Sequence, residues 1–143
     1  MASTRMTVAE REAFLKEMRV GILSVAEDGR GPLTVPVWYD YDGAAGLWFL
    51  TDADSRKGEL LQQQHRCSLC VQDERSPYRY VSVEGPVELG EGDRERHLRP
   101  LARRYLGVIQ GDRYVERSAG EPGETLLVTL RPERWLTVDY RKE

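Results

Sequence analysis

A pair of basic side chains at the start of a predicted helix is the strongest chemical signal in the chain. Residues 47–51 (LWFLT) are the apolar, aromatic and β-branched types that favour a strand. Asp54 or Ser55 can then cap a helix by accepting from its free backbone N–H groups, and Arg56 and Lys57 fall in the first turn. Cations are unfavourable at this end of a helix, whereas anions are stabilised there. We therefore predict that Arg56 and Lys57 bind a phosphate.

Residues near this pair could complete a binding site. The Thr51 hydroxyl lies at the exit of the strand and could share the phosphate, while Trp38, Tyr39 and Tyr80 could leave a slot for a second stacked ring. The aromatic side chains that could line such a slot are Trp38, Tyr39, Tyr41, Trp48, Tyr78 and Tyr80. The alternative is that the basic residues are simply solvated and that the aromatics form core or cross-strand pairs.

The sequence offers few residues for metal, redox or nucleophilic catalysis. Cys67 and Cys70 have C-x-x-C spacing, but they lie in a predicted strand, where positions three apart point to opposite faces, and no histidine is spaced to complete a zinc site. We therefore expect two inert thiols and no metal. His65 and His97 are the two histidines, and no G-x-S-x-G, G-x-G-x-x-G or P-loop motif accompanies them. An enzymatic reaction would therefore depend on a bound cofactor.

Composition limits the class of protein. With 143 residues, the chain is expected to form a single domain spanning residues 1–143. The net charge of −3 provides no general attraction to nucleic acid or to an anionic membrane. No apolar run approaches the ~20 residues of a membrane span, and residues 1–10 lack the pattern of a signal peptide. We expect a cytoplasmic protein whose anion site is a local cluster of charge.

The predicted elements are mainly strands, in an α+β pattern. Helices are predicted over residues 7–18, with Thr7 as cap and Glu10 closing a capping box, and over 54–64. A further helix lies within 90–107, where Pro100 requires a kink or a late start, and 108–123 should form a short helix and a loop. Strands are predicted over 19–26, 32–41, 47–51, 66–72, 78–89, 125–130 and 134–140.

Short, consecutive strands joined by hairpins favour an antiparallel barrel, because closure removes exposed sheet edges. Pro36 cannot donate a backbone hydrogen bond, so its position in the second strand should be an edge, a bulge or the rim of an opening.

Residues 47–71 resemble the pyridoxamine 5′-phosphate oxidase-like split barrels. In that family a strand with an apolar-aromatic-x-Thr ending leads into S-R-K, a helix, and a strand entered by an Arg with Ser and Leu shortly after it. The matching residues here are Phe49 to Thr51, Ser55-Arg56-Lys57, and Arg66 with Ser68 and Leu69. The resemblance extends to the Asp28-Gly29-Arg30 turn, to Val83-Glu84-Gly85 and to residues 134–142, and it is weak over 90–123.

The resemblance implies a six-stranded antiparallel split β-barrel with peripheral helices. It further implies a homodimer that binds FMN or the deazaflavin coenzyme F-420 at the subunit interface. The family pattern brings Leu50 and Thr51 to the cofactor and Arg56 and Lys57 to its phosphate, and it lays the backbone of residues 35–37 along the ring. The implied cofactor-binding residues are Val35, Pro36, Val37, Trp38, Leu50, Thr51, Ser55, Arg56, Lys57 and Tyr80.

Two departures from the family pattern argue against pyridoxamine phosphate oxidation itself. The oxidase that names the family carries R-x-x-L-L-K in its second strand, whereas this chain has Val35-Pro36-Val37-Trp38-Tyr39-Asp40, and the Arg-rich C-terminal tail is absent. We therefore expect a flavin- or deazaflavin-dependent oxidoreductase that transfers hydride between the cofactor ring and a small organic substrate. The alternatives are a non-catalytic flavin-binding or sensing module and a structural barrel whose site has decayed.

Overall fold

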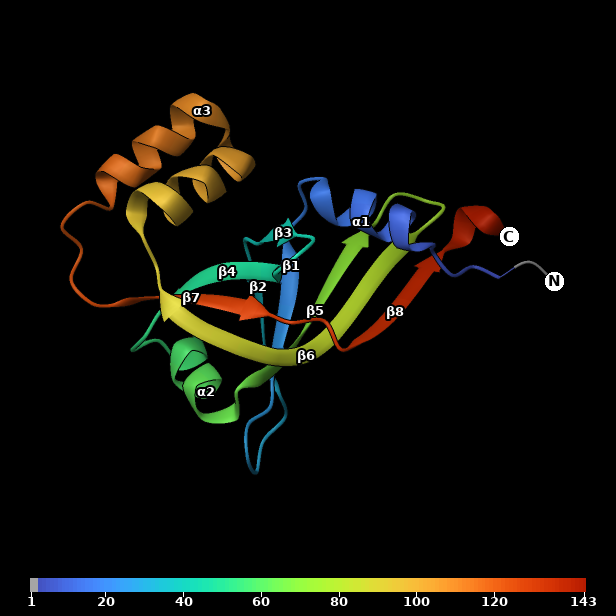
Figure 1. The fold of residues 1–143 in the computed structure, drawn as a ribbon, viewed down its shortest axis with the longest axis horizontal. Helices are drawn as coiled ribbons and strands as arrows, with labels where there is room; N and C mark the ends of the chain where they lie inside the picture. The colour runs from blue at the N-terminus through green and yellow to red at the C-terminus, as the bar shows by residue number, and fades with distance from the viewer. Residues whose placement is uncertain (1–2) are drawn as a thin grey trace.

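The computed structural model describes residues 3–143, in which antiparallel strands predominate. The strands form one eight-stranded sheet in the order β2-β1-β5-β6-β7-β4-β3, with β8 paired to β6. Three α-helices lie around the sheet (Figure 1). The strands are β1 (Gly21–Val25), β2 (Leu33–Val37), β3 (Asp40–Asp42), β4 (Gly46–Asp52), β5 (Arg66–Asp73), β6 (Arg79–Glu91), β7 (Thr125–Leu130) and β8 (Arg134–Asp139). The helices are α1 (Val8–Lys16), α2 (Arg56–Gln64) and α3 (Arg99–Arg117), with short helical turns at Arg94–Leu98 and Tyr140–Lys142.

The long strand β6 joins the two halves of the sheet. Its first part pairs with β5 and β8, and its second part pairs with β7. Between these parts the chain leading from β7 to β8 passes so close to Gly85 that a Cβ there would lie 1.9 Å from the Arg131 carbonyl oxygen. The result is an antiparallel, half-barrel α+β fold that resembles a split barrel. Residues 3–143 contain eight strand segments, so the count of six implied by the resemblance was wrong.

The core lies inside the curved sheet, and α1 closes one end of it (Figure 1). Thr7 caps α1 and forms the predicted capping box with Glu10. Phe14 and Leu15 on this helix are fully buried. The helix ends at Lys16, two residues before the predicted boundary, which leaves Met18 exposed.

A helical hairpin, defined here as residues 94–117, stands at the other end of the sheet (Figure 1). Pro100 lies in the first turn of α3, so of the two predicted alternatives, a kink or a late start, the structure has the late start. The hairpin turns at Gly107, whose φ of 82° is a left-handed conformation that favours glycine. A second helical arm follows as far as Arg117, and a loop leads into β7, as the sequence predicts.

The strand predicted over 32–41 is broken, because the hairpin takes over the backbone hydrogen bonds of Tyr39. The Tyr39 N–H donates to the Tyr105 hydroxyl at 3.0 Å, and its carbonyl accepts from the Arg104 guanidinium at 3.0 Å. Arg104 also forms a 3.3 Å ion pair with Asp40, the acid that replaces the basic end of the family pattern. Asp40 therefore anchors the hairpin to the sheet.

Two further expectations concern β2 and β5. As predicted, Pro36 lies on an edge strand, because β2 ends the strand order of the sheet. Cys67 is buried, Cys70 is half-buried on the opposite face of β5, and both are free thiols. Burial raises the pKa of the Cys67 thiol to about 12, which disfavours the reactive thiolate. Within residues 3–143, no helix combines the length and apolarity needed to cross a membrane.

Candidate cofactor site

The start of α2 is held close to the end of β4. Ser55 caps the helix: its hydroxyl accepts from the Gly58 N–H at 3.0 Å and donates to the Asp52 carbonyl at 2.7 Å. The Thr51 hydroxyl lies 3.2 Å from the Ser55 hydroxyl. A Cβ at position 58 would lie 2.1 Å from the Asp52 carbonyl oxygen, so only glycine allows this approach. These contacts fix the positions of Arg56 and Lys57 relative to the strand.

The two predicted phosphate ligands have different surroundings. Arg56 is about half-exposed and forms an ion pair with Glu27, a residue of the β1–β2 turn whose side chain is only 9% exposed. Lys57 is half-buried, and burial lowers its pKa while the nearby Asp52 carboxylate opposes that change. The Lys57 ammonium group therefore lies in a partly desolvated environment. The carboxylate partner of Arg56 was not predicted from the sequence.

Lys57 lines a cavity of about 280 Å³ between the sheet and the helical hairpin. Leu50, Thr51 and Asp52 of β4 contribute to the same cavity. Its remaining lining comes from the start of the hairpin, from the end of α3 and from the loop before β7, namely Gly92, Asp93, Arg94, Leu98, Tyr114, Ser118, Glu121, Pro122, Gly123 and Thr125. The structure thus brings three of the predicted residues, Leu50, Thr51 and Lys57, into one cavity.

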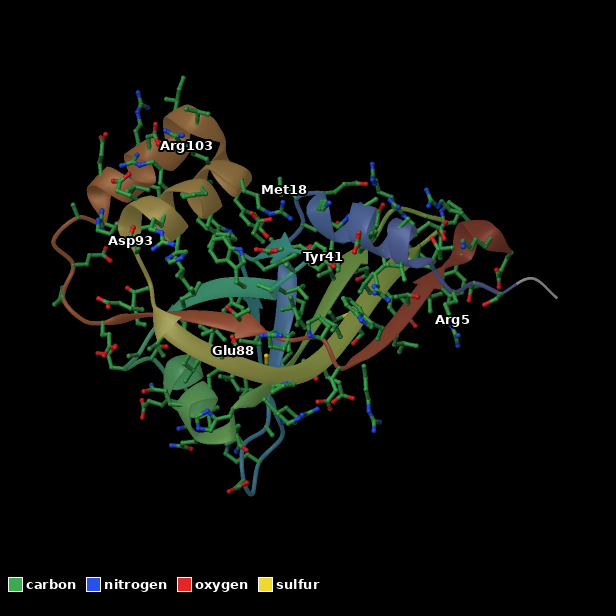
Figure 2. All side chains as sticks on the ribbon, viewed as in Figure 1. Arg5, Met18, Tyr41, Glu88, Asp93 and Arg103 are labelled. Atoms are coloured by element: carbon green, nitrogen blue, oxygen red, sulfur yellow. The ribbon has the colours of Figure 1, made fainter. Side chains whose placement is uncertain are left out.

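The hairpin is fastened over this cavity by polar contacts at its base. Asp93, which lies where β6 gives way to the hairpin (Figure 2), caps the first turn by accepting from the backbone N–H groups of Glu95 and Arg96. The Arg94 guanidinium donates to the carbonyls of Val115 and Ser118, which ties the first arm to the second. The hairpin that covers the cavity is therefore stabilised by hydrogen bonds between its own two arms.

Aromatic contacts join the hairpin to the sheet. Trp38 stacks on Tyr105, with ring centroids 5.1 Å apart and planes 5° apart, and it also contacts Tyr114, which lines the cavity. On β4, Trp48 meets His97 edge-on at 5.7 Å. One face of Trp38 is thus covered by its own chain.

Tyr39 does not line a slot, and that part of the slot prediction was wrong. Its side chain is fully buried in the core and its hydroxyl donates to the Leu15 carbonyl at 3.1 Å. Burial raises the pKa of this phenol above its ordinary value. The residue is structural because it anchors the C-terminal end of α1.

The remaining predicted residues lie elsewhere on the sheet. Val35 and Pro36 pair with β1 on one side only, so the other backbone edge of β2 has no strand partner within residues 3–143. Val37 is buried, and Tyr80 lies half-buried on β6 between Gln72 and Val138. The lining of the cavity, as described for residues 3–143, includes none of these four. Their role at a cofactor stays a prediction.

Sequence reasoning missed the residues that reach the site through tertiary contacts. Asp93 and Arg94 lie two and three residues after the end of β6, and a capping signal at Asp93 was available to find the start of the hairpin. Glu27 and Tyr114 carry no comparable local signal, because their proximity to the site depends on how the β1–β2 turn and the hairpin fold against β4 and α2.

Comparison with known proteins places the chain in a family. A family profile described as Pyridoxamine 5'-phosphate oxidase matches residues 7–139. The chain belongs to this pyridoxamine 5′-phosphate oxidase-like, split-barrel family. No curated protein matches it.

Solved structures share the fold. The conserved hypothetical protein Rv2991 from Mycobacterium tuberculosis is 25% identical, with a TM-score of 0.81 and coverage of 99% of this chain and 90% of that one. A protein described as an F420 reductase is 21% identical, with a TM-score of 0.69 and coverage of 87% and 94%. A FAD-binding protein from Mesorhizobium loti is 21% identical, with a TM-score of 0.65 and coverage of 96% and 97%. The last two likenesses concern the fold alone.

Proposed function

We propose that the protein is an oxidoreductase that uses FMN or the deazaflavin coenzyme F-420 and acts on a small organic substrate. The observation that carries the proposal is the cavity in which Lys57, Thr51 and Leu50 meet beneath the helical hairpin. Family membership supports the choice of cofactor class, because proteins described as an F420 reductase and a FAD-binding protein share this fold.

The residues of the cavity fit part of such a cofactor. A half-buried ammonium group and the N-terminal end of α2 favour a phosphate. Leu50 and Leu98 offer apolar surface to a ring system, and Tyr114 adds an aromatic face. A concave pocket that combines apolar surface with a few polar groups is typical of a cofactor site.

The proposed mechanism depends on binding and orientation by the chain. Lys57 and Arg56 would hold the phosphate and Leu50 would contact the ring, while the hairpin would exclude water from the site. The bound cofactor would supply the hydride chemistry. No side chain has to act as a general acid or base in this scheme.

A homodimer is part of the proposal. The outer face of the sheet carries Ile22 and Leu136, which are 42% and 58% exposed, and Val20, directly before β1, is 46% exposed. Such apolar exposure is typical of an interface. The family pattern implies that the cofactor lies at the interface between two copies of the chain. Sedimentation at micromolar concentration should therefore give the mass of two chains, and a monomer would contradict this part of the proposal.

Titration of the purified protein with FMN and with F-420, followed by fluorescence, tests the cofactor. We expect at least one to bind below tens of micromolar, and binding of neither would refute the proposal. The double variant Arg56→Ala, Lys57→Ala should weaken binding by roughly a hundredfold or more, since two charge-assisted hydrogen bonds at about 1.5–3 kcal/mol each sum to at least about 3 kcal/mol. The melting temperature of the cofactor-free protein should fall, because Arg56→Ala leaves the poorly exposed Glu27 carboxylate without this partner, so binding is compared at a temperature at which both proteins are folded.

Turnover distinguishes an enzyme from a binding module. The loaded protein should oxidise or reduce a member of a panel of quinones, enones and tetrapyrroles. Tight cofactor binding with no turnover of any member would instead favour the flavin-binding or sensing alternative.

A further inference from the structure

The ion pair between Glu27 and Arg56 changes what the anion site can bind. Glu27 lies on the β1–β2 turn, and its carboxylate contacts the Arg56 guanidinium. Because this side chain is only 9% exposed, water screens the pair less than it screens an exposed pair. One of the two cations at the start of α2 is therefore already compensated by the protein.

The charges around the site leave little excess for an anion. Arg56 and Lys57 on α2 and the exposed Arg30, 3.9 Å from Glu27, supply the positive charge, and Glu27 and Asp52 oppose it. Deeper in the cavity, the carboxylates of Asp93 and Glu121 outnumber Arg94. Arg94 is in addition engaged with backbone carbonyls. These four cations and four carboxylates sum to zero net charge, so the site offers no net Coulomb attraction to offset the larger desolvation cost of a dianion.

We infer that Glu27 is a specificity-determining residue that makes the site prefer a monoanionic phosphodiester to a dianionic phosphomonoester. The inference rests on the proposed function, because it concerns the phosphate of the same cofactor. A phosphomonoester carries a charge of about −1.5 to −2 at neutral pH, with a second pKa near 6, whereas a diester keeps a single charge. The flavin ring and its ribityl chain are common to both kinds of ligand, so the phosphate alone would decide between them.

Two flavins that differ only at the phosphate test this inference. The probes are FMN and its methyl phosphodiester, titrated at pH 8 against the full-length protein by isothermal calorimetry. The wild-type protein should bind the diester more tightly. Glu27→Gln keeps the shape of the side chain and removes its charge, and it should strengthen FMN binding by roughly tenfold and diester binding by roughly threefold, because the Coulomb energy scales with ligand charge. Asp28→Asn, on the same turn and with no ion pair among residues 3–143, makes the same change in net charge and should leave the ratio unchanged.

A pH comparison on the wild-type protein needs no variant. At pH 5 the FMN phosphate is mainly a monoanion, so the preference for the diester should largely disappear. The diester itself controls for protonation of the surrounding carboxylates. Equal affinity for the two esters at pH 8, or an unchanged ratio in Glu27→Gln, would overturn the inference while leaving the proposed function intact. Failure of both esters and of F-420 to bind would overturn both.

Discussion

Arg104 fastens the helical hairpin to the rest of the protein, and its removal should destabilise the fold markedly. Its guanidinium donates to the carbonyls of Lys16 at 2.7 Å, Glu17 at 3.0 Å and Leu15 at 3.1 Å, which lie at the C-terminal end of α1. It also donates to the Tyr39 carbonyl at 3.0 Å. The Arg104 guanidinium thus caps the C-terminal end of α1 and binds the backbone between β2 and β3. It thereby joins both segments to the hairpin.

The size of the effect follows from this geometry. Arg104 is only 13% exposed, so in Arg104→Ala the carbonyls that it satisfies would lose their partner in a poorly solvated place. A single hydrogen bond to a charged group contributes about 1.5–3 kcal/mol, but bonds to one guanidinium are not additive. We expect the free energy of unfolding to fall by about 3–4 kcal/mol, which corresponds to roughly 10 °C in melting temperature for a domain of this size.

Urea unfolding monitored by tryptophan fluorescence measures this change, at one protein concentration throughout because an oligomer would make stability depend on concentration. The neighbouring Arg103 provides a matched control, since its guanidinium contacts Asp112 on the hairpin surface and is 43% exposed (Figure 2). Arg103→Ala should cost no more than about 1 kcal/mol, as is usual for surface pairs. If Arg104→Ala and Arg103→Ala have the same stability, the anchoring role of Arg104 is refuted.

Two further predictions concern the glycine beneath the phosphate site and the acid stability of the sheet. Gly58→Ala should destabilise the protein by about 2–4 kcal/mol and weaken flavin binding, because the new Cβ would collide with the Asp52 backbone. Thermal melts should show the loss of stability, and titrations should show the weaker binding. Gly31→Ala, at an uncrowded position, should show neither effect. The Arg75 guanidinium, hydrogen-bonded to Asp73, holds the pKa of that carboxyl well below its usual range. Since the unfolded chain binds this proton more readily, the stabilisation is present above about pH 4 and is lost as the pH falls below it. Acid unfolding of Asp73→Asn should therefore begin from a lower stability and show a weaker pH dependence than the wild type; identical curves would contradict this assignment.

Local signals in the sequence predicted most of the fold. The capping box at Thr7, the late helix start at Pro100 and the edge position of Pro36 are each determined by the chemistry of one or two residues, and the structure confirms them. The break after Val37 was missed because its cause is distant in sequence: Arg104 and Tyr105 bind the backbone of Tyr39.

The candidate site was predictable to a smaller extent. The S-R-K motif gave Arg56 and Lys57 from a single segment, but the carboxylate of Glu27 reaches Arg56 only through the packing of the β1–β2 turn. The cover over Lys57 comes from residues 92–94 and 114–123, where the family pattern is weakest. A slot beside Tyr39 was expected because an aromatic residue in a strand looks the same whether it faces the core or a ligand.

The central position of β6 has a consequence for how the chain must fold. β6 pairs with β5, which precedes it in the sequence, and with β7 and β8, which follow it. β4 pairs with β7, a strand more than 70 residues later, as the pairing of Asp52 with Thr125 shows. Loops of considerable length must therefore close before these contacts can stabilise the structure. Domains dominated by such non-local pairing fold in roughly milliseconds to seconds. The two arms of the helical hairpin, in contrast, contact each other over short sequence distances, although its attachment to the sheet and to α1 depends on Arg104 and Tyr105.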